Sequence, residues 1–195
     1  LVDLGGYQDL KVNFKATNNL DQRPTQSVEC LHQHHGKTVQ ASCYWGIKPE
    51  WAHYPIINAQ METVATKKTF SSAYALHRCV VPCSGWYEWT GEISHKKKHR
   101  FSPEGDGVLF MAGILFPYKP FPDKLFPDKQ QPYQANLFPL VTITCEADAH
   151  CGIYHHRMPL LIDESKVSDW LLLPQSLHEL GHFHDHHSIK INPPI

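Results

Sequence analysis

Apolar residues occur along this chain in short runs, several of which alternate with polar positions in the way typical of β-strands. The runs predict strands at residues 39–47, 79–81, 86–89, 108–116, 140–144 and 188–191. Two other segments predict short helices: residues 69–76, with Thr69 or Ser71 as the N-cap, and residues 165–173, which end before Pro174. Because strands outnumber helices and do not alternate with them in βαβ units, the pattern predicts an α+β fold.

A proline-rich segment, residues 116–139, interrupts this pattern. It holds six prolines and repeats Phe-Pro-Asp-Lys at 121–124 and 126–129. Proline is excluded from helix interiors and central strands, so the segment predicts a loop insertion between two strands or a short polyproline II stretch. A tolerated surface insertion and a partner-binding motif are both open interpretations.

Length and composition limit the classes of protein to consider. The 195 residues, 42% of them hydrophobic, predict one globular domain over residues 1–195 and exclude wholesale disorder. The longest apolar run, residues 108–116, is too short to cross a bilayer, and no signal peptide precedes it. The net charge of −1 excludes a globally basic nucleic-acid coat, yet residues 67–100 hold seven Lys and Arg against two Glu. We therefore expect one basic groove in the region of Glu88.

Cysteine and histidine patterns raise the question of metal. Six cysteines without a CxxC spacing favour reduced, partly buried thiols in an intracellular protein, with a disulfide or metal role as the alternative. His178-Glu-Leu-Gly-His182 matches the HExxH pattern of zinc metalloproteases. No Glu follows Glu179 to act as a third ligand, so a helix end with a His-rich turn is the favoured interpretation. We expect no metal and no cofactor.

Three segments carry candidate chemistry. Glu88 lies between aromatic residues after a glycine, where burial would raise its pKa and suit it to proton transfer. His155 and Arg157 follow a predicted strand and suit an anionic ligand, because Arg holds phosphate oxygens bidentately. Trp45 and Trp51 flank a Gly-Pro turn and offer stacking surfaces for unpaired bases. For each segment an ordinary structural or surface role is the alternative.

Taken in order, these segments resemble the SOS response-associated peptidase (SRAP) family. The motifs that carry the resemblance are WGIKPEW (45–51), NAQMET (58–63), RCVVPCSGWYEW (78–89), TCEADA (144–149) and HHRMP (155–159), preceded by the turn RPTQ at 23–26. The resemblance covers nearly the whole chain, and the RCVVP…GWYEW and HHRMP segments are highly specific together. It implies a curved, mainly antiparallel sheet approaching a β-barrel, with helices at its periphery.

The resemblance also implies a chemistry, in which the α-amine and thiol of a first-residue cysteine attack the aldehyde of an abasic site in single-stranded DNA and form a thiazolidine crosslink. Asn58 would position the amine or the sugar, Glu88 would be the general acid and base, and His155 would assist opening of the sugar ring. Arg78 and Arg157 would hold phosphates and Trp45 would pack against bases. The implied catalytic set is Asn58, Glu88 and His155, and the implied DNA-binding set is Trp45, Trp51, Arg78, Arg157 and Met158.

Two positions depart from the family pattern. Leu1 stands first instead of a cysteine, so we expect the sequence to lack the family's first segment and, as written, to form no thiazolidine. Gln60 stands where the family usually has Arg, which predicts weaker DNA binding with a shallower salt dependence. The alternative function is therefore a non-catalytic single-stranded DNA-binding relative. We expect an intracellular monomer, nuclear in a eukaryote, that binds abasic single-stranded DNA and no membrane.

Overall fold

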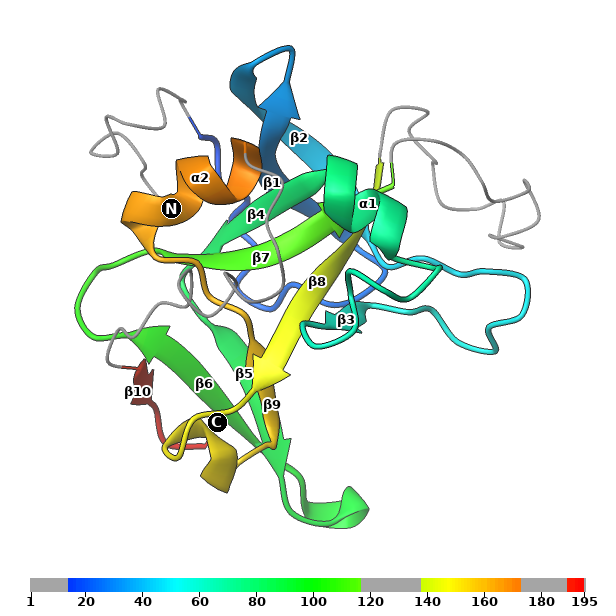
Figure 1. Cartoon of the computed structure of the whole chain (residues 1–195). Helices are drawn as coiled ribbons and strands as arrows, with labels where there is room; N and C mark the ends of the chain where they lie inside the picture. The colour runs from blue at the N-terminus through cyan, green and yellow to red at the C-terminus, as the bar shows by residue number, and fades with distance from the viewer. Residues whose placement is uncertain (1–13, 117–137, 173–188, 195) are drawn as a thin grey trace.

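A curved sheet of seven strands forms the centre of the computed structural model, which describes residues 14–116, 138–172 and 189–194 (Figure 1). Its strands are β1 (Ser27–His34), β2 (Lys37–Trp45), β3 (Asn58–Gln60), β4 (Arg78–Cys83), β7 (Leu109–Leu115), β8 (Phe138–Glu146) and β9 (Arg157–Pro159). They are hydrogen-bonded in the order β2-β1-β4-β7-β8-β3, with β9 also on β8. Because β2 pairs with β8 as well, the pairings form a ring.

A second, three-stranded sheet lies below the first in Figure 1. It consists of β5 (Trp86–Thr90), β6 (Lys97–Pro103) and β10 (Ile189–Ile191), in the order β10-β6-β5. Only Ser84 and Gly85 separate β4 from β5, so the chain passes directly from one sheet to the other. Gly85 has φ +144°, and a Cβ there would lie 2.1 Å from the carbonyl oxygen of Phe101. The corner between the sheets therefore requires a glycine.

Two short helices cover the large sheet. The helix α1 (Ser71–Leu76) contacts β4 and β7, and α2 (Val167–Leu172) contacts β1 and β4. Trp170 of α2 is fully buried and donates its indole N–H to the carbonyl of Cys79, 2.9 Å away. Burying a side chain of this size contributes roughly 3 kcal/mol to stability. Short 3₁₀ turns occur at Ile93–His95, Cys151–Ile153 and Glu164–Lys166.

The expected α+β class, with a mainly antiparallel curved sheet and peripheral helices, is confirmed. All six predicted strands and both helices are present, with shifted ends. The predicted side-chain cap of the first helix is wrong, because the N-cap is Phe70 and no side chain caps the helix. The sequence patterns missed β1, β3, β6 and β9.

Several predicted features fall outside the described residues. These are most of the proline-rich segment, namely residues 117–137, and the HExxH pattern at 178–182. Phe138 and Pro139, assigned to that insertion from the sequence, begin β8. All six cysteines are described, and each is a free thiol. Among the described helices, none is long and apolar enough to cross a membrane.

Candidate functional site

A cavity of about 1150 Å³ opens between the large sheet, the small sheet and the segment that precedes β1. Its walls come from residues 16–24, the ends of β2 and β3, the β4–β5 corner, and the strands β8 and β9. Seven of the eight site residues expected from the sequence line it: Trp45, Trp51, Asn58, Glu88, His155, Arg157 and Met158. The fold therefore brings together motifs that are up to 113 residues apart along the chain (Trp45 to Met158).

Glu88 and His155 are two titratable side chains that lie side by side in this cavity. The two side chains come from β5 and from the turn before β9, and Oε2 of Glu88 lies 3.9 Å from Nδ1 of His155. Burial raises the pKa of the Glu88 carboxyl, and the adjacent His155 opposes part of that rise. A carboxyl with a raised pKa can give and take a proton near neutral pH, as general acid–base chemistry requires.

The imidazole of His155 is oriented by the backbone of its own turn. Its Nδ1 lies 2.8 Å from the carbonyl oxygen of Arg157. The backbone N–H of Arg157 lies 3.3 Å from the same nitrogen, so Nδ1 faces both the carbonyl and the amide of residue 157. The position of residue 157 thus determines the direction of the His155 ring.

Arg157 is engaged by protein groups. Its Nη1 and Nη2 donate to the two carboxylate oxygens of Glu62, at 2.8 and 3.0 Å, and Nη2 also donates to the Thr144 carbonyl at 2.5 Å. Its side chain is only 17% exposed. Glu62 follows β3 within the NAQMET segment, so the ion pair joins that motif to the HHRMP motif of Arg157. In this structure Arg157 anchors β9 to that segment.

Asn58 begins β3, a strand that pairs in parallel with β8. The hydroxyl of Thr142 on β8 donates to Oδ1 of Asn58 at 2.5 Å. With the amide oxygen accepting this bond, the amide nitrogen is the end that can donate into the cavity. Trp45 is similarly fixed, because its indole N–H donates to the Ile57 carbonyl at 3.2 Å.

Arg78 is the exception among the expected residues. It does not line the cavity and is only 6% exposed. Its guanidinium lies over the rings of Tyr74 and Trp170, 5.7 and 5.3 Å from their centres. Burial lowers the pKa of this guanidinium. Arg78 thus packs against α1 and α2, outside the cavity, and the phosphate-binding role expected for it stays a prediction.

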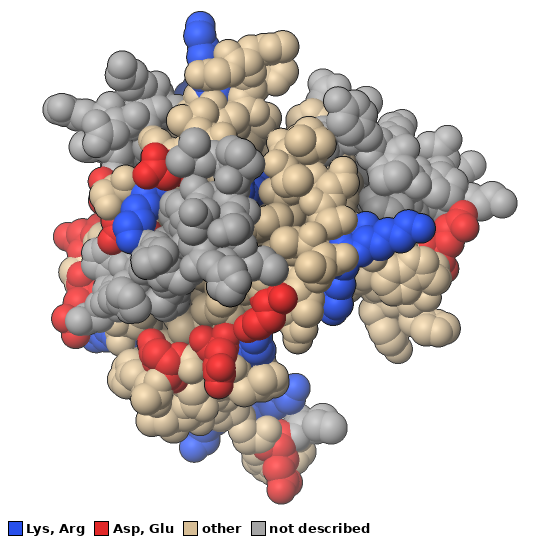
Figure 2. All heavy atoms as spheres, in the orientation of Figure 1, with Lys and Arg blue, Asp and Glu red and all other residues tan. Residues whose placement is uncertain are grey.

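The expected basic groove is also much reduced. Of the seven Lys and Arg residues between 67 and 100, only Lys67 lines the cavity. On the face seen in Figure 2 the basic side chains are scattered among acidic ones. Local charge along the sequence did not produce one patch in the cavity wall, because Lys98 is paired with Asp21, Arg100 donates to the Ser84 carbonyl and Arg78 is buried.

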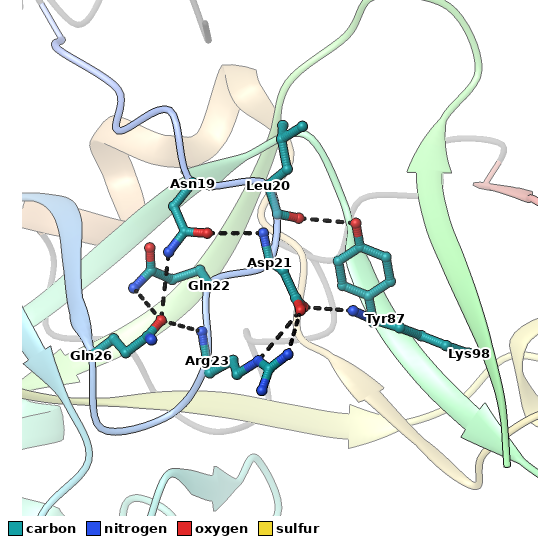
Figure 3. Close-up of polar contacts among 8 residues, drawn as sticks. All are labelled: Asn19, Leu20, Asp21, Gln22, Arg23, Gln26, Tyr87 and Lys98. Carbon is teal, nitrogen blue, oxygen red and sulfur yellow. Dashed lines mark hydrogen bonds and ion pairs between the residues drawn. The ribbon is translucent and has the colours of Figure 1, made fainter. Parts of the chain in front are cut away.

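A turn at residues 19–26 forms a cavity wall, and the sequence indicated only part of it, the RPTQ turn (Figure 3). The side-chain oxygen of Gln26 accepts the backbone N–H of Arg23 at 2.9 Å, which closes the turn. Backbone hydrogen bonds between Trp45 and both Thr25 and Gln26 tie it to the large sheet. Tyr87 of β5 donates its hydroxyl to the Leu20 carbonyl at 2.9 Å. The turn therefore bridges the two sheets over the cavity.

The sequence is similar to a known protein family and to several curated proteins. The family model described as SOS response associated peptidase (SRAP) matches residues 6–192. The chain is 32% identical over 130 residues to "Abasic site processing protein YedK" of Escherichia coli, a match covering 66% of this chain and 53% of that protein. It is 25% identical over 154 residues to "Abasic site processing protein YoaM" of Bacillus subtilis, covering 76% of this chain and 63% of the relative.

The chain thus spans between half and two thirds of the length of these curated relatives. Among solved structures, a protein from Bordetella bronchiseptica superposes with a TM-score of 0.73 at 18% identity, covering 100% of this chain and 96% of that one. At this identity the likeness concerns the fold alone.

Proposed function

The chain belongs to the SRAP family, and from this premise we propose that it recognises and processes abasic sites in single-stranded DNA. The relatives named above are abasic site processing proteins, and the proposal extends that role to this chain. The observation that carries it is the meeting of Asn58, Glu88 and His155 in one cavity, from β3, β5 and the turn before β9.

The cavity suits a lesion with its neighbouring nucleotides. Pockets for small molecules measure about 300–1,000 Å³, and this one, at about 1150 Å³, exceeds that range. Trp45 and the half-exposed Trp89 supply aromatic surface in its wall, and Trp51 is 68% exposed. Aromatic faces of this kind stack unpaired bases, which are available only where the DNA is single-stranded.

The reacting group of an abasic site is the aldehyde of its ring-opened sugar. His155 would assist ring opening by moving a proton, and Glu88 would then protonate and deprotonate the carbonyl oxygen and the attacking amine. The amide nitrogen of Asn58 would hold the amine or the sugar hydroxyl in place. The pKa of Glu88, raised by burial, suits both directions of that transfer.

We further propose that the intact protein uses an N-terminal cysteine as the nucleophile. Its α-amine, with a pKa of about 8, is partly neutral at pH 7 and condenses with the aldehyde to an imine, releasing one water. The cysteine thiol then adds to the imine carbon and gives its proton to the nitrogen, which closes a thiazolidine. No oxidant or reductant is needed.

A gel assay tests this chemistry. Full-length protein is incubated with single-stranded DNA holding one abasic site, then heated and run under denaturing conditions. The proposal predicts a heat-stable adduct whose formation slows at least tenfold in Glu88→Gln and is unchanged in the control Glu104→Gln, an exposed carboxylate outside the cavity. An unaltered rate in Glu88→Gln would refute its role in proton transfer.

The alternative within this family is a relative that binds single-stranded DNA without reacting. The same assay separates the two functions, because binding without any adduct from the full-length protein favours the non-catalytic one. A difference in affinity between abasic and intact strands would then measure recognition alone.

A further inference from the structure

The turn at residues 19–26 carries a carboxylate that is shared by two cations (Figure 3). Asp21 accepts from Nζ of Lys98 at 2.6 Å and from Nη2 of Arg23 at 2.9 Å. Both contacts lower the pKa of Asp21, with the Lys98 hydrogen bond the larger cause. Asp21 therefore stays ionised, and the three side chains together hold one positive charge.

The two cations differ in how they face solvent. Lys98 has a 21% exposed side chain, and its ammonium lies 3.9 Å from the centre of the Tyr87 ring. Arg23 has a 72% exposed side chain and lines the cavity. The excess charge of the cluster is therefore presented by Arg23.

Arg23 is also held in a defined direction. Its Nε and Nη2 both face the same oxygen of Asp21, at 3.3 and 2.9 Å. In Figure 3 the third nitrogen, Nη1, points away from Asp21, and it makes no hydrogen bond to any residue in the described part of the chain. A guanidinium fixed on one side presents its remaining N–H groups to a ligand with little loss of side-chain entropy.

The other positions expected to contact phosphates are not available in the way that Arg23 is. Arg157 is occupied by Glu62, Arg78 is buried elsewhere, and Gln60 is uncharged. The remaining cation in the cavity wall, among the described residues, is Lys67, which is exposed.

We propose that Arg23 and Lys67 bind phosphates of the DNA strand that enters the cavity, in the role that the family resemblance implied for Arg78 and Arg157. This inference rests on the proposed function, because it assumes that the cavity receives a single strand. Asp21 and Lys98 position Arg23 without touching the DNA.

Salt dependence of binding tests the inference. A single-stranded oligonucleotide with one abasic site, and the same oligonucleotide intact, are titrated by fluorescence anisotropy over a range of salt concentrations. Each lost phosphate contact reduces the slope of log K against log salt by about 0.7 for single strands. We expect Arg23→Gln and Lys67→Gln each to show that reduction on both oligonucleotides, and the double variant about twice as much.

Two further variants make the result specific. Arg23→Lys keeps the charge and should retain the slope. Lys37→Gln removes an exposed cation at the start of β2, outside the cavity, and should leave the slope unchanged. Thermal unfolding of each variant verifies that the fold is intact.

The outcomes distinguish this inference from the proposed function. A preference for the abasic strand with unchanged slopes in both Gln variants overturns the phosphate assignment and leaves the function standing. Reduced slopes without any preference for the abasic strand support the assignment and contradict the function. No binding to either oligonucleotide contradicts both.

Discussion

The ion pair between Glu62 and Arg157 offers a direct test of how the site is held together. Replacing Glu62 by Gln keeps the shape of the side chain but removes the negative charge that two guanidinium nitrogens share. Arg157 then keeps its bond to the Thr144 carbonyl but loses its bidentate partner. Because Arg157 also supplies the carbonyl that orients His155, the change should reach the cavity.

The size of the effect follows from the exposure of the pair. Hydrogen bonds to charged groups contribute about 1.5–3 kcal/mol to stability, and a fully buried pair broken on one side loses 3–5 kcal/mol. Glu62, however, has a 46% exposed side chain, so solvent screens its charge. We expect Glu62→Gln to lower the free energy of unfolding by about 1 kcal/mol, which corresponds to a fall in Tm of roughly 2–4 °C for a chain of this size.

The effect should also depend on pH in a defined direction. Hydrogen bonding to Arg157 lowers the pKa of Glu62 below its ordinary value of 4.5. A carboxyl with a lowered folded-state pKa contributes stability above its unfolded pKa and loses it as pH falls through the folded value. The wild type and Glu62→Gln should therefore differ at pH 7 and converge as the pH falls through the lowered pKa of Glu62.

Urea unfolding followed by tryptophan fluorescence measures this difference at each pH. The control is Glu50→Gln, an exposed glutamate on the loop before β3, which should unfold like the wild type. Equal stability of the wild type and Glu62→Gln at pH 7, or a difference that persists at low pH, would refute the reasoning.

Three other changes extend the account. The substitution His155→Ala removes the imidazole whose charge lowers the pKa of Glu88, so the Glu88 carboxyl should titrate at higher pH. An unchanged midpoint in an NMR titration would show that the two groups do not interact. In chemical denaturation, Gly85→Ala should lower the free energy of unfolding by roughly 2–4 kcal/mol, because the new Cβ would lie 2.1 Å from the backbone of β6. The control Gly36→Ala, which has open space around it, should lower the free energy of unfolding by only about 1 kcal/mol. Gln60→Arg adds a cation to the cavity wall and should steepen the salt dependence of DNA binding by about 0.7; an unchanged slope would show that position 60 makes no phosphate contact.

Sequence patterns predicted strands that hold a run or an alternation of apolar residues. In β7 every residue is buried, and β8 holds the β-branched run LVTIT. The strand β6 was missed because its sequence, KKHRFSP, begins with basic residues and has no alternating apolar positions. It is a strand because β5 and β10 supply backbone partners on either side, which no local pattern records.

Residues expected at the site lie together in the structure, but their individual contacts were not predicted. The resemblance to the SRAP family implied a set of Asn58, Glu88 and His155, and all three line one cavity. Arginine is rarely buried, so no local pattern predicted that Arg78 would pack over the rings of Tyr74 and Trp170. The partner of Arg157 lies 95 residues away, and only the folded sheet brings them together.

The central claim is that this cavity recognises an abasic site, and the most direct test compares two dissociation constants. The chain is titrated against a single-stranded oligonucleotide with one abasic site and against the same oligonucleotide with a base in that position. We predict tighter binding of the abasic strand by at least tenfold, and loss of this preference in Asn58→Ala while binding of the intact strand is kept. Equal affinity for the two strands, or a preference that survives Asn58→Ala, would contradict the account.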